Sequence, residues 1–150
     1  PTQVYRDPAT LFVADFIGEM NQVSAQAGAA ETLLVGGTEM QCRSHEFSTG
    51  RQIIAAIRPE DVIPHGNGKG GGAAADRIET PENAFEVQIN EMEFLGSYWR
   101  CRLKNDFFGD QELVADFSVN AARRLELQEH DTMTIELPRN RLLAFEQAGE

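Results

Sequence analysis

The sequence predicts an all-β fold, a small barrel or a sandwich, on three observations. Residues 85–103 form the longest segment in which apolar and polar side chains alternate, and a period of two indicates half-buried strands. Other alternating segments are short and separated by glycine turns, which favours a barrel or a sandwich over a βαβ fold. Within residues 85–103 the alternation changes phase and then meets a glycine, and both features let a sheet bend into a barrel.

The composition restricts the classes of partner. The chain has 150 residues with 24 acidic and 13 basic side chains, a formal net charge of −11. It is long enough for one domain or for two very small ones that share a core. Nucleic acid and anionic lipid both require clustered positive charge, so neither is expected as a partner. No membrane helix and no signal peptide are visible, and because the chain starts at Pro1 we expect a fragment.

The first predicted element is a helix. Asp7 is a suitable N-cap, Pro8 fits the first helical position and Gly18 fits the end. One face of this helix is apolar and consists of Ala9, Phe12, Val13, Phe16 and Ile17. Such a face must pack against this domain or against a part of the protein outside the fragment.

Four short strands are predicted next, within residues 21–63. The first contains Val23 and Ala25 and ends at Gly28, and the fourth ends at Pro59. The last three strands are expected at residues 32–35, 39–43 and 51–58.

Residues 65–76 are rich in glycine and include three consecutive alanines. They can bury almost nothing, so a flexible loop is expected. Residues 66–71 match the G-x-G-x-x-G pattern of dinucleotide sites, which requires a preceding strand and a following helix. Pro64 precedes the pattern and a glycine–alanine run follows it, so a linker is the favoured interpretation.

Residues 85–103 are predicted to form a hairpin. One extra residue near Asn90 and Glu91 would explain the change of phase, which predicts a β-bulge. Gly96 and Ser97 predict a turn or a sharp bend. The core inside this hairpin is expected to contain Phe85, Val87, Ile89 and Phe94.

The last part of the chain predicts two more strands and a short helical segment. Asn120 is the expected cap of a helical turn over residues 121–127. Strands are expected at residues 112–117 and 132–137, and Leu142, Leu143 and Phe145 form a final apolar piece.

No segment predicts catalysis or a metal site. Cys42 and His45 have C-x-x-H spacing, but a structural zinc site needs four ligands. Glu91 and Glu93 share a strand face, where a solvated surface is commoner than a catalytic pair of carboxylates. Cys42 and Cys101 lie in strand-like segments and are expected to be buried free thiols in a reducing compartment, with a disulfide as the alternative.

Three segments, taken together, resemble a known family. Residues 1–8 run into Phe-Val-Ala-Asp-Phe-Ile-Gly at 12–18, and residues 56–62 read Ala-Ile-Arg-Pro-Glu-Asp-Val. Residues 93–97 read Glu-Phe-Leu-Gly-Ser and are followed by the strands near the end of the chain. In this order the segments resemble the C-terminal regulatory region, called the TOBE domain, of ATP-binding subunits of ABC-type importers.

The resemblance implies a fold and a division of the chain. The fold would be two small interleaved OB-like β-barrels (TOBE/MOP-like) preceded by one short N-terminal α-helix. Residues 1–19 would be the end of the ATPase domain, and residues 20–150 the regulatory domain with its loop at 65–76.

The resemblance also implies a role. The fragment would be non-catalytic and cofactor-free, because ATP and Mg²⁺ belong to the missing ATPase domain. It would form a homodimer and work with its own ATPase domain and with permease subunits, on the inner face of the cell membrane and without insertion into it. Arg58 could form a local ion pair or a contact to another domain or subunit. The candidate interface residues are Arg58, Glu60, Glu93, Phe94, Tyr98, Arg100 and Arg102.

The transported substrate is indicated only by residues 93–100. They look most like subunits for aminoethylphosphonate or polyamine uptake, followed by those for ferric iron and sugars. No segment resembles the oxyanion-binding pocket of molybdate-type members. The alternative function is a small-molecule-sensing β-barrel that acts as a binding module.

Overall fold

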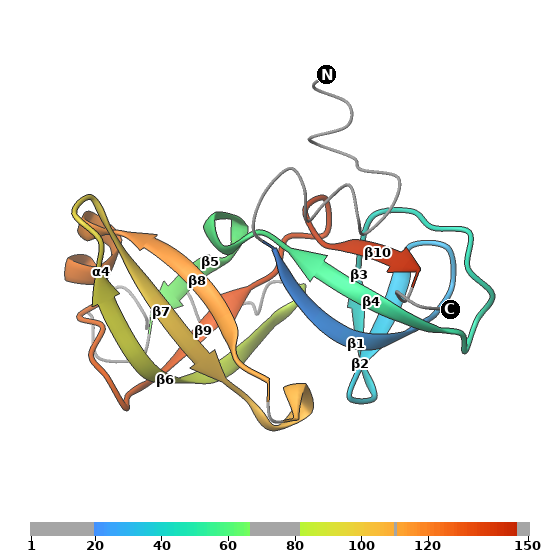
Figure 1. Ribbon diagram of the computed structural model, residues 1–150, viewed down its shortest axis with the longest axis horizontal. Coiled ribbons are helices and arrows are strands. Elements are labelled where there is room, and N and C mark those ends of the chain that lie inside the picture. Colours follow the sequence, from blue (N-terminus) through green and yellow to red (C-terminus); the bar gives the residue numbers. More distant parts are fainter. Residues whose placement is uncertain (1–19, 67–81, 110, 147–150) are drawn as a thin grey trace, which may run out of the picture.

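The computed structural model describes residues 20–66, 82–109 and 111–146, and it is mostly β, as the sequence predicts (Figure 1). Ten strands and one short α-helix lie in this described part of the chain. The expected helix at residues 7–18 and most of the expected loop at 65–76 lie outside it. No helix among the described residues is long and apolar enough to cross a membrane.

The strands form two antiparallel five-stranded sheets. Sheet 1 has the order β10-β4-β1-β2-β3 and sheet 2 the order β5-β9-β6-β7-β8. The strands of sheet 1 are β1 (Asn21–Ala27), β2 (Thr32–Val35), β3 (Thr38–Gln41), β4 (Gln52–Ile57) and β10 (Leu143–Glu146). Those of sheet 2 are β5 (Ile63–Gly66), β6 (Ala84–Phe94), β7 (Tyr98–Lys104), β8 (Leu113–Ser118) and β9 (Thr132–Glu136).

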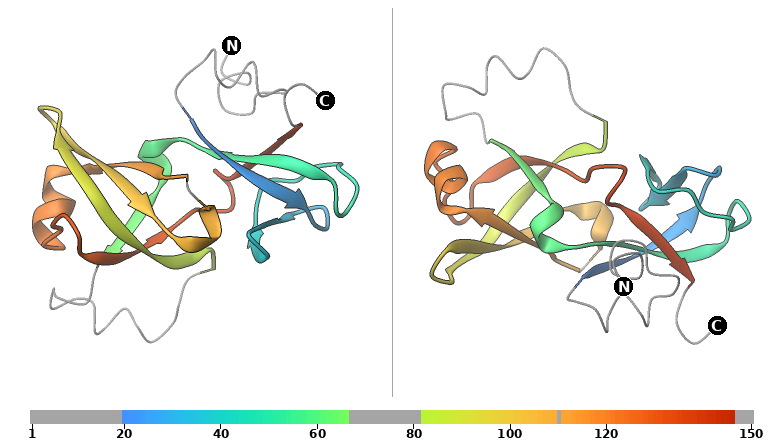
Figure 2. Two further views of the ribbon diagram at one scale, coloured as in Figure 1. Left: turned by 60° about the horizontal axis from the view of Figure 1, so that its bottom comes forward. Right: turned by 90° about the horizontal axis from the view of Figure 1, so that it is seen from above.

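Each sheet takes one strand from the other half of the sequence. The chain leaves β4 through a 3-10 turn, η1 (Pro59–Asp61), and enters β5, which pairs with β9 in sheet 2. After β9 it returns to sheet 1, where β10 pairs with β4. Figure 2 shows β10 running beside the strands of sheet 1, remote from α4 (Val119–Arg124) at the far end of sheet 2. The closure of the sheets into two barrels stays a prediction.

The predicted bulge and bend of the hairpin are confirmed. The register between β6 and β7 shifts between Ile89 and Glu91, where the alternation changes phase. Gly96 has φ +98°, a backbone conformation that other residues seldom adopt, and it lies between the end of β6 and the start of β7.

Two predictions about where elements begin were wrong. The cap of α4 is Ser118, whose side chain accepts a hydrogen bond from the Ala121 amide at 3.0 Å, and Asn120 lies inside the helix. His65, expected to begin the loop, belongs to β5 and bonds to Glu136 of β9 at 2.8 Å. Strand β5 was missed because it is short, contains Pro64 and shows no alternation.

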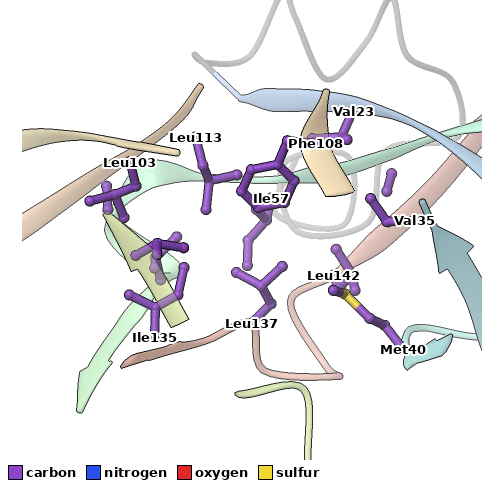
Figure 3. Close-up of a cluster of buried hydrophobic side chains, with 14 of the residues drawn as sticks. Val23, Val35, Met40, Ile57, Leu103, Phe108, Leu113, Ile135, Leu137 and Leu142 are labelled. Atoms are coloured by element: carbon purple, nitrogen blue, oxygen red, sulfur yellow. The ribbon is translucent and has the colours of Figure 1, made fainter. Parts of the chain in front are cut away.

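One apolar core extends across both sheets. Figure 3 shows Ile57 and Leu113 beside Phe108, which belongs to a second 3-10 turn, η2 (Asp106–Phe108), and Leu137 and Leu142 belong to the same core. Val87 and Ile89 lie in this core as predicted, and Phe85 packs partly buried against it. Phe94 does not, because it is 51% exposed near the tip of the hairpin.

Two asparagine side chains join the sheets. Asn21 donates to the carbonyls of Ile57 (3.2 Å) and Val114 (2.7 Å) and accepts from the Val114 amide (2.7 Å). Asn83 donates to the carbonyls of Gln41 and Leu137, both at 2.7 Å, and accepts from the Gln41 amide at 2.8 Å. Each side-chain amide therefore forms hydrogen bonds to the backbone of one strand of sheet 1 and to the backbone of one segment in or next to sheet 2. No strand pairing connects these two partners, so the side chains hold sheet 1 against sheet 2.

Candidate functional site

The end of the β6–β7 hairpin presents two faces of different chemistry. Phe94 lies opposite Trp99, and Glu93 lies opposite Arg100 in the ladder. Because successive side chains of a strand point to opposite faces, these two pairs face in opposite directions. The predicted interface residues of the hairpin are therefore divided: Phe94 lies on one face, and Glu93, Tyr98, Arg100 and Arg102 lie on the other.

The face with Phe94 borders an apolar groove, here called the hairpin groove. Its volume is about 720 Å³. The rings of Phe94 and Trp99 contact each other in a tilted arrangement with centroids 5.2 Å apart. The groove is lined by Met92, Phe94, Trp99, Val119, Ala122, Arg123, Leu127, Gln128 and Glu129. Most of its lining is apolar, and Arg123 and Glu129 contribute one charge of each sign.

The second wall of the groove comes from α4 and the segment after it. Ser118 ends β8 and caps α4, so the chain turns from strand to helix at one residue. Beyond α4, the His130 amide donates to the Ile89 carbonyl at 2.6 Å, and Glu129 accepts from the Met92 amide at 3.0 Å. These bonds tie the wall to β6. Sequence reasoning missed the groove because its lining residues come from segments that are far apart in the chain.

The opposite face carries ion pairs. Arg100 donates through Nε and Nη2 to the two carboxylate oxygens of Asp116 at 2.9 and 3.0 Å. This bidentate geometry satisfies both groups within the sheet. Arg102 lies 3.8 Å from Glu91, and both side chains are largely exposed. Glu91 and Glu93 therefore lie opposite arginines, which suits a surface face better than a pair of catalytic carboxylates.

The remaining two interface candidates lie elsewhere. Arg58 follows β4 and precedes η1, and Glu60 lies in η1, which packs against β8. Arg58 is only 7% exposed, whereas Glu60 is exposed. The structure therefore does not bring them to the tip of the hairpin.

The cysteines and histidines do not form a metal site in the part of the chain that the structure describes. No group of three or more His, Cys, Asp or Glu residues there could hold a metal ion. The carbonyl of Thr32 can only accept, so His45 Nε2 donates to it at 2.8 Å, and His45 Nδ1 accepts from the Phe47 amide. Both ring nitrogens of His45 are thus engaged.

Both cysteines are free and buried, which confirms the prediction of buried thiols. Burial, helped by Glu31 and opposed by Arg139, raises the pKa of Cys42 to about 11. Burial and the neighbouring Asp116 raise the pKa of Cys101 to about 12. Neither thiol is therefore suited to be a nucleophile or a ligand at neutral pH.

Comparison with known proteins assigns relatives to the chain. The TOBE domain family matches residues 55–145. The Fe(3+) ions import ATP-binding protein FbpC 2 of Rhizobium meliloti is 42% identical over 148 residues, 99% of this chain and 38% of that protein. The sulfate/thiosulfate import ATP-binding protein CysA 2 of Chromobacterium violaceum is 26% identical over 145 residues, 97% of this chain and 37% of that protein. This chain thus spans well under half the length of both relatives.

A solved structure has a similar fold. The cytoplasmic molybdate-binding protein ModG, in a form with molybdate bound, matches with a TM-score of 0.67 and 13% sequence identity. The match covers 85% of this chain and 96% of that chain. At this level of identity the likeness concerns the fold.

Proposed function

The chain belongs to the TOBE domain family, and we propose that it is the C-terminal regulatory and dimerisation domain of the ATP-binding subunit of an ABC importer. The observation that carries this proposal is the match to two import ATP-binding proteins over nearly the whole of this chain. The chain spans under two fifths of each relative, and the proposal assigns the ATPase activity to another part of the protein.

The proposal also covers how the chain is divided between two domains and where in the cell the subunit acts. Residues 1–19 end the ATPase domain, which holds ATP and Mg²⁺, and residues 20–150 form a non-catalytic domain of two interleaved OB-like barrels. The exchange of β5 and β10 between the sheets supports the interleaved arrangement. The subunit works on the inner face of the cell membrane beneath permease subunits.

Deletion of residues 20–150 from the full-length subunit tests the regulatory role. We expect the truncated subunit to lose dimer stability and transport regulation while its nucleotide site persists. Light scattering measures the dimer, and uptake by cells measures transport. Unchanged transport and an unchanged dimer would remove the proposal.

The proposed dimer contact is the hairpin groove, with a second copy of this chain as its occupant. Phe94 and Leu95 are exposed at 51% and 39%, so the tip offers apolar surface beside an apolar groove. A two-fold symmetric interface uses the same patch on both copies. Because the hairpin tip and the groove lie in one such patch, each tip would enter the groove of the other copy. The paired charges on the opposite face of the hairpin, among them Arg100 and Arg102, would form the rim. Glu60 would be a separate contact, beside Arg58, which is largely covered within the domain.

Light scattering on a double variant, Phe94→Ser with Leu95→Ser, tests this contact. We expect the dimer dissociation constant to rise by at least about tenfold, since the exposed apolar anchors would be lost. Ile63→Ser is the matched control, because Ile63 is also a large exposed apolar residue, at 38%, but lies in β5. An unchanged dissociation constant in the double variant would refute this interface.

For the transported substrate, ferric iron is now the first candidate. The relative with 42% identity is an Fe(3+) ions import protein, which favours ferric iron over aminoethylphosphonate or a polyamine. Uptake assays with radioactive iron in cells lacking the full-length gene separate these substrates. Loss of phosphonate or polyamine uptake, with iron uptake intact, would instead favour aminoethylphosphonate or a polyamine as the substrate.

A second candidate function is small-molecule sensing in the hairpin groove. Its volume of about 720 Å³ lies within the usual range of ligand pockets, roughly 300–1,000 Å³, and aromatic rings line it. The single cation Arg123 is offset by Glu129, which disfavours an oxyanion such as the molybdate of ModG. Calorimetry with phosphonates, polyamines, sugars and molybdate tests sensing, and an absence of heat with all four would exclude it.

A further inference from the structure

Sheet 1 has a second apolar surface on the side that faces away from the shared core. In β4, Ile53, Ala55 and Ile57 belong to the core that both sheets share. The alternate residues of the same strand, Ile54 and Ala56, belong to a separate cluster. A strand that is apolar on both faces is typical of a sheet that is covered on both sides.

This separate cluster, here called the outer cluster, is continuous across two paired strands. Leu143 lies opposite Ala56, and Phe145 lies opposite Ile54, in the ladder between β10 and β4. Ala56, Leu143 and Phe145 are buried, and Ile54 is partly buried. Met20, the first residue that the structure describes, completes the cluster.

We propose that residues 8–17 form an amphipathic helix that packs its apolar face on the outer cluster. The position of Met20 supports this occupant, because only Gly18 and Glu19 separate the predicted helix from a residue of the cluster. Any segment that ends at Gly18 is therefore tethered beside β4 and β10.

The chemistry and the dimensions of the segment fit the surface. The predicted helix has an apolar face formed by Ala9, Phe12, Val13, Phe16 and Ile17, whereas Asp15 lies on its other side. Ten helical residues span about 15 Å at 1.5 Å per residue. Paired strands lie about 4.8 Å apart, so such a helix is long enough to cross both β10 and β4. The packing is independent of the proposed dimer, and it would hold the segment before Met20 rigidly against sheet 1.

A double-mutant cycle in the full chain tests the packing. Phe16→Ala removes a side chain of the helix, and Ile54→Ala removes one of the outer cluster. We expect each change to lower the melting temperature by about 2–6 °C. We also expect the melting temperature of the combined variant to fall by measurably less than the sum of the two single decreases, since contacting residues couple. Asp15→Ala, on the polar face of the same helix, is the matched control and should leave the melting temperature within about 1 °C.

Amide hydrogen exchange gives an independent readout. Phe16→Ala should speed exchange of the β10 amides at least about tenfold, because their covering layer is loosened, while β6 and β7 stay protected. Additive losses in the cycle with unchanged exchange in β10 would overturn the proposal. An effect of Phe16→Ala that vanished on dilution would also overturn it, since the occupant would then be a second copy.

Discussion

At the scale of single residues, the two cysteines show how burial controls chemistry. Burial disfavours a thiolate at Cys42 and Cys101, and the nearby acidic groups Glu31 and Asp116 add to this effect. At Cys42 the cation Arg139 offsets only part of it. Burial therefore makes them parts of the apolar core instead of reactive groups.

Thiol labelling at pH 8 checks this conclusion. The native chain should react with neither thiol on the time scale of the assay, and both should react in urea, because the thiolate is the reactive form. Rapid labelling of the native chain would contradict the burial.

The same shifts predict how stability depends on pH. Above the ordinary pKa of about 9 the unfolded chain loses the thiol protons, whereas the folded chain keeps them up to about 11. The unfolded state then binds fewer protons, so the free energy of unfolding should fall as the pH rises from 9 to 11. Urea titrations of the chain and of a Cys42→Ala variant measure this slope, which should be shallower in the variant.

The backbone conformation of Gly96 determines the bend of the hairpin between β6 and β7. At φ +98° a β-branched side chain is strained, although a Cβ atom there would meet nothing within 4 Å. Gly96→Val should cost about 1–3 kcal/mol of unfolding free energy through the backbone alone, without unfolding sheet 2. Urea denaturation measures the loss, and Gly96→Asn should lose less. Equal losses in both variants would point to a packing role instead.

At the scale of elements, the sequence predicted what is local. The alternation in residues 85–103 located β6, β7 and the bulge, because a change in the phase of the alternation can be read directly from the order of residues. Phe94 was misplaced because alternation gives the face of a side chain but not how far the core extends along the strand. Strand β5 and the hairpin groove were missed because pairing with β9 and the packing of α4 involve residues far away in the chain.

The start of α4 offers a direct test at this scale. Ser118→Ala removes the acceptor of the Ala121 amide and should cost about 1 kcal/mol of unfolding free energy. Asn120→Ala is the control, because Asn120 is exposed within the helix and alanine favours helices. Thermal unfolding followed by circular dichroism compares them, and a larger loss for Asn120→Ala would place the cap where the sequence first suggested.

At the scale of the whole molecule, side-chain amides fix the two sheets against each other. Asn83 has a positive φ of 64° and makes three hydrogen bonds to Gln41 and Leu137, which belong to different regions of the fold. No periodicity marks such a residue, because its partners lie 42 and 54 positions away.

Asn83→Ala should therefore lower the free energy of unfolding by about 2–4 kcal/mol, since it leaves backbone groups without their partners. Asn90→Ala is the matched control, because the Asn90 side chain makes an exposed hydrogen bond to Glu112. Urea denaturation gives both values. Similar losses in the two variants would mean that the junction between the sheets contributes little.

The exchange of strands also has a consequence for how the protein is made. Sheet 1 cannot complete its strand pairing until residues 143–146 have been synthesised. Strand β5 is synthesised some seventy residues before its partner β9, so it has no strand to pair with in the meantime. During translation the first half of the domain therefore emerges with unpaired strand edges, and its pairings span long stretches of chain, which slows folding. A ribosome stalled before β10 should hold a nascent chain that proteases still cut within β4.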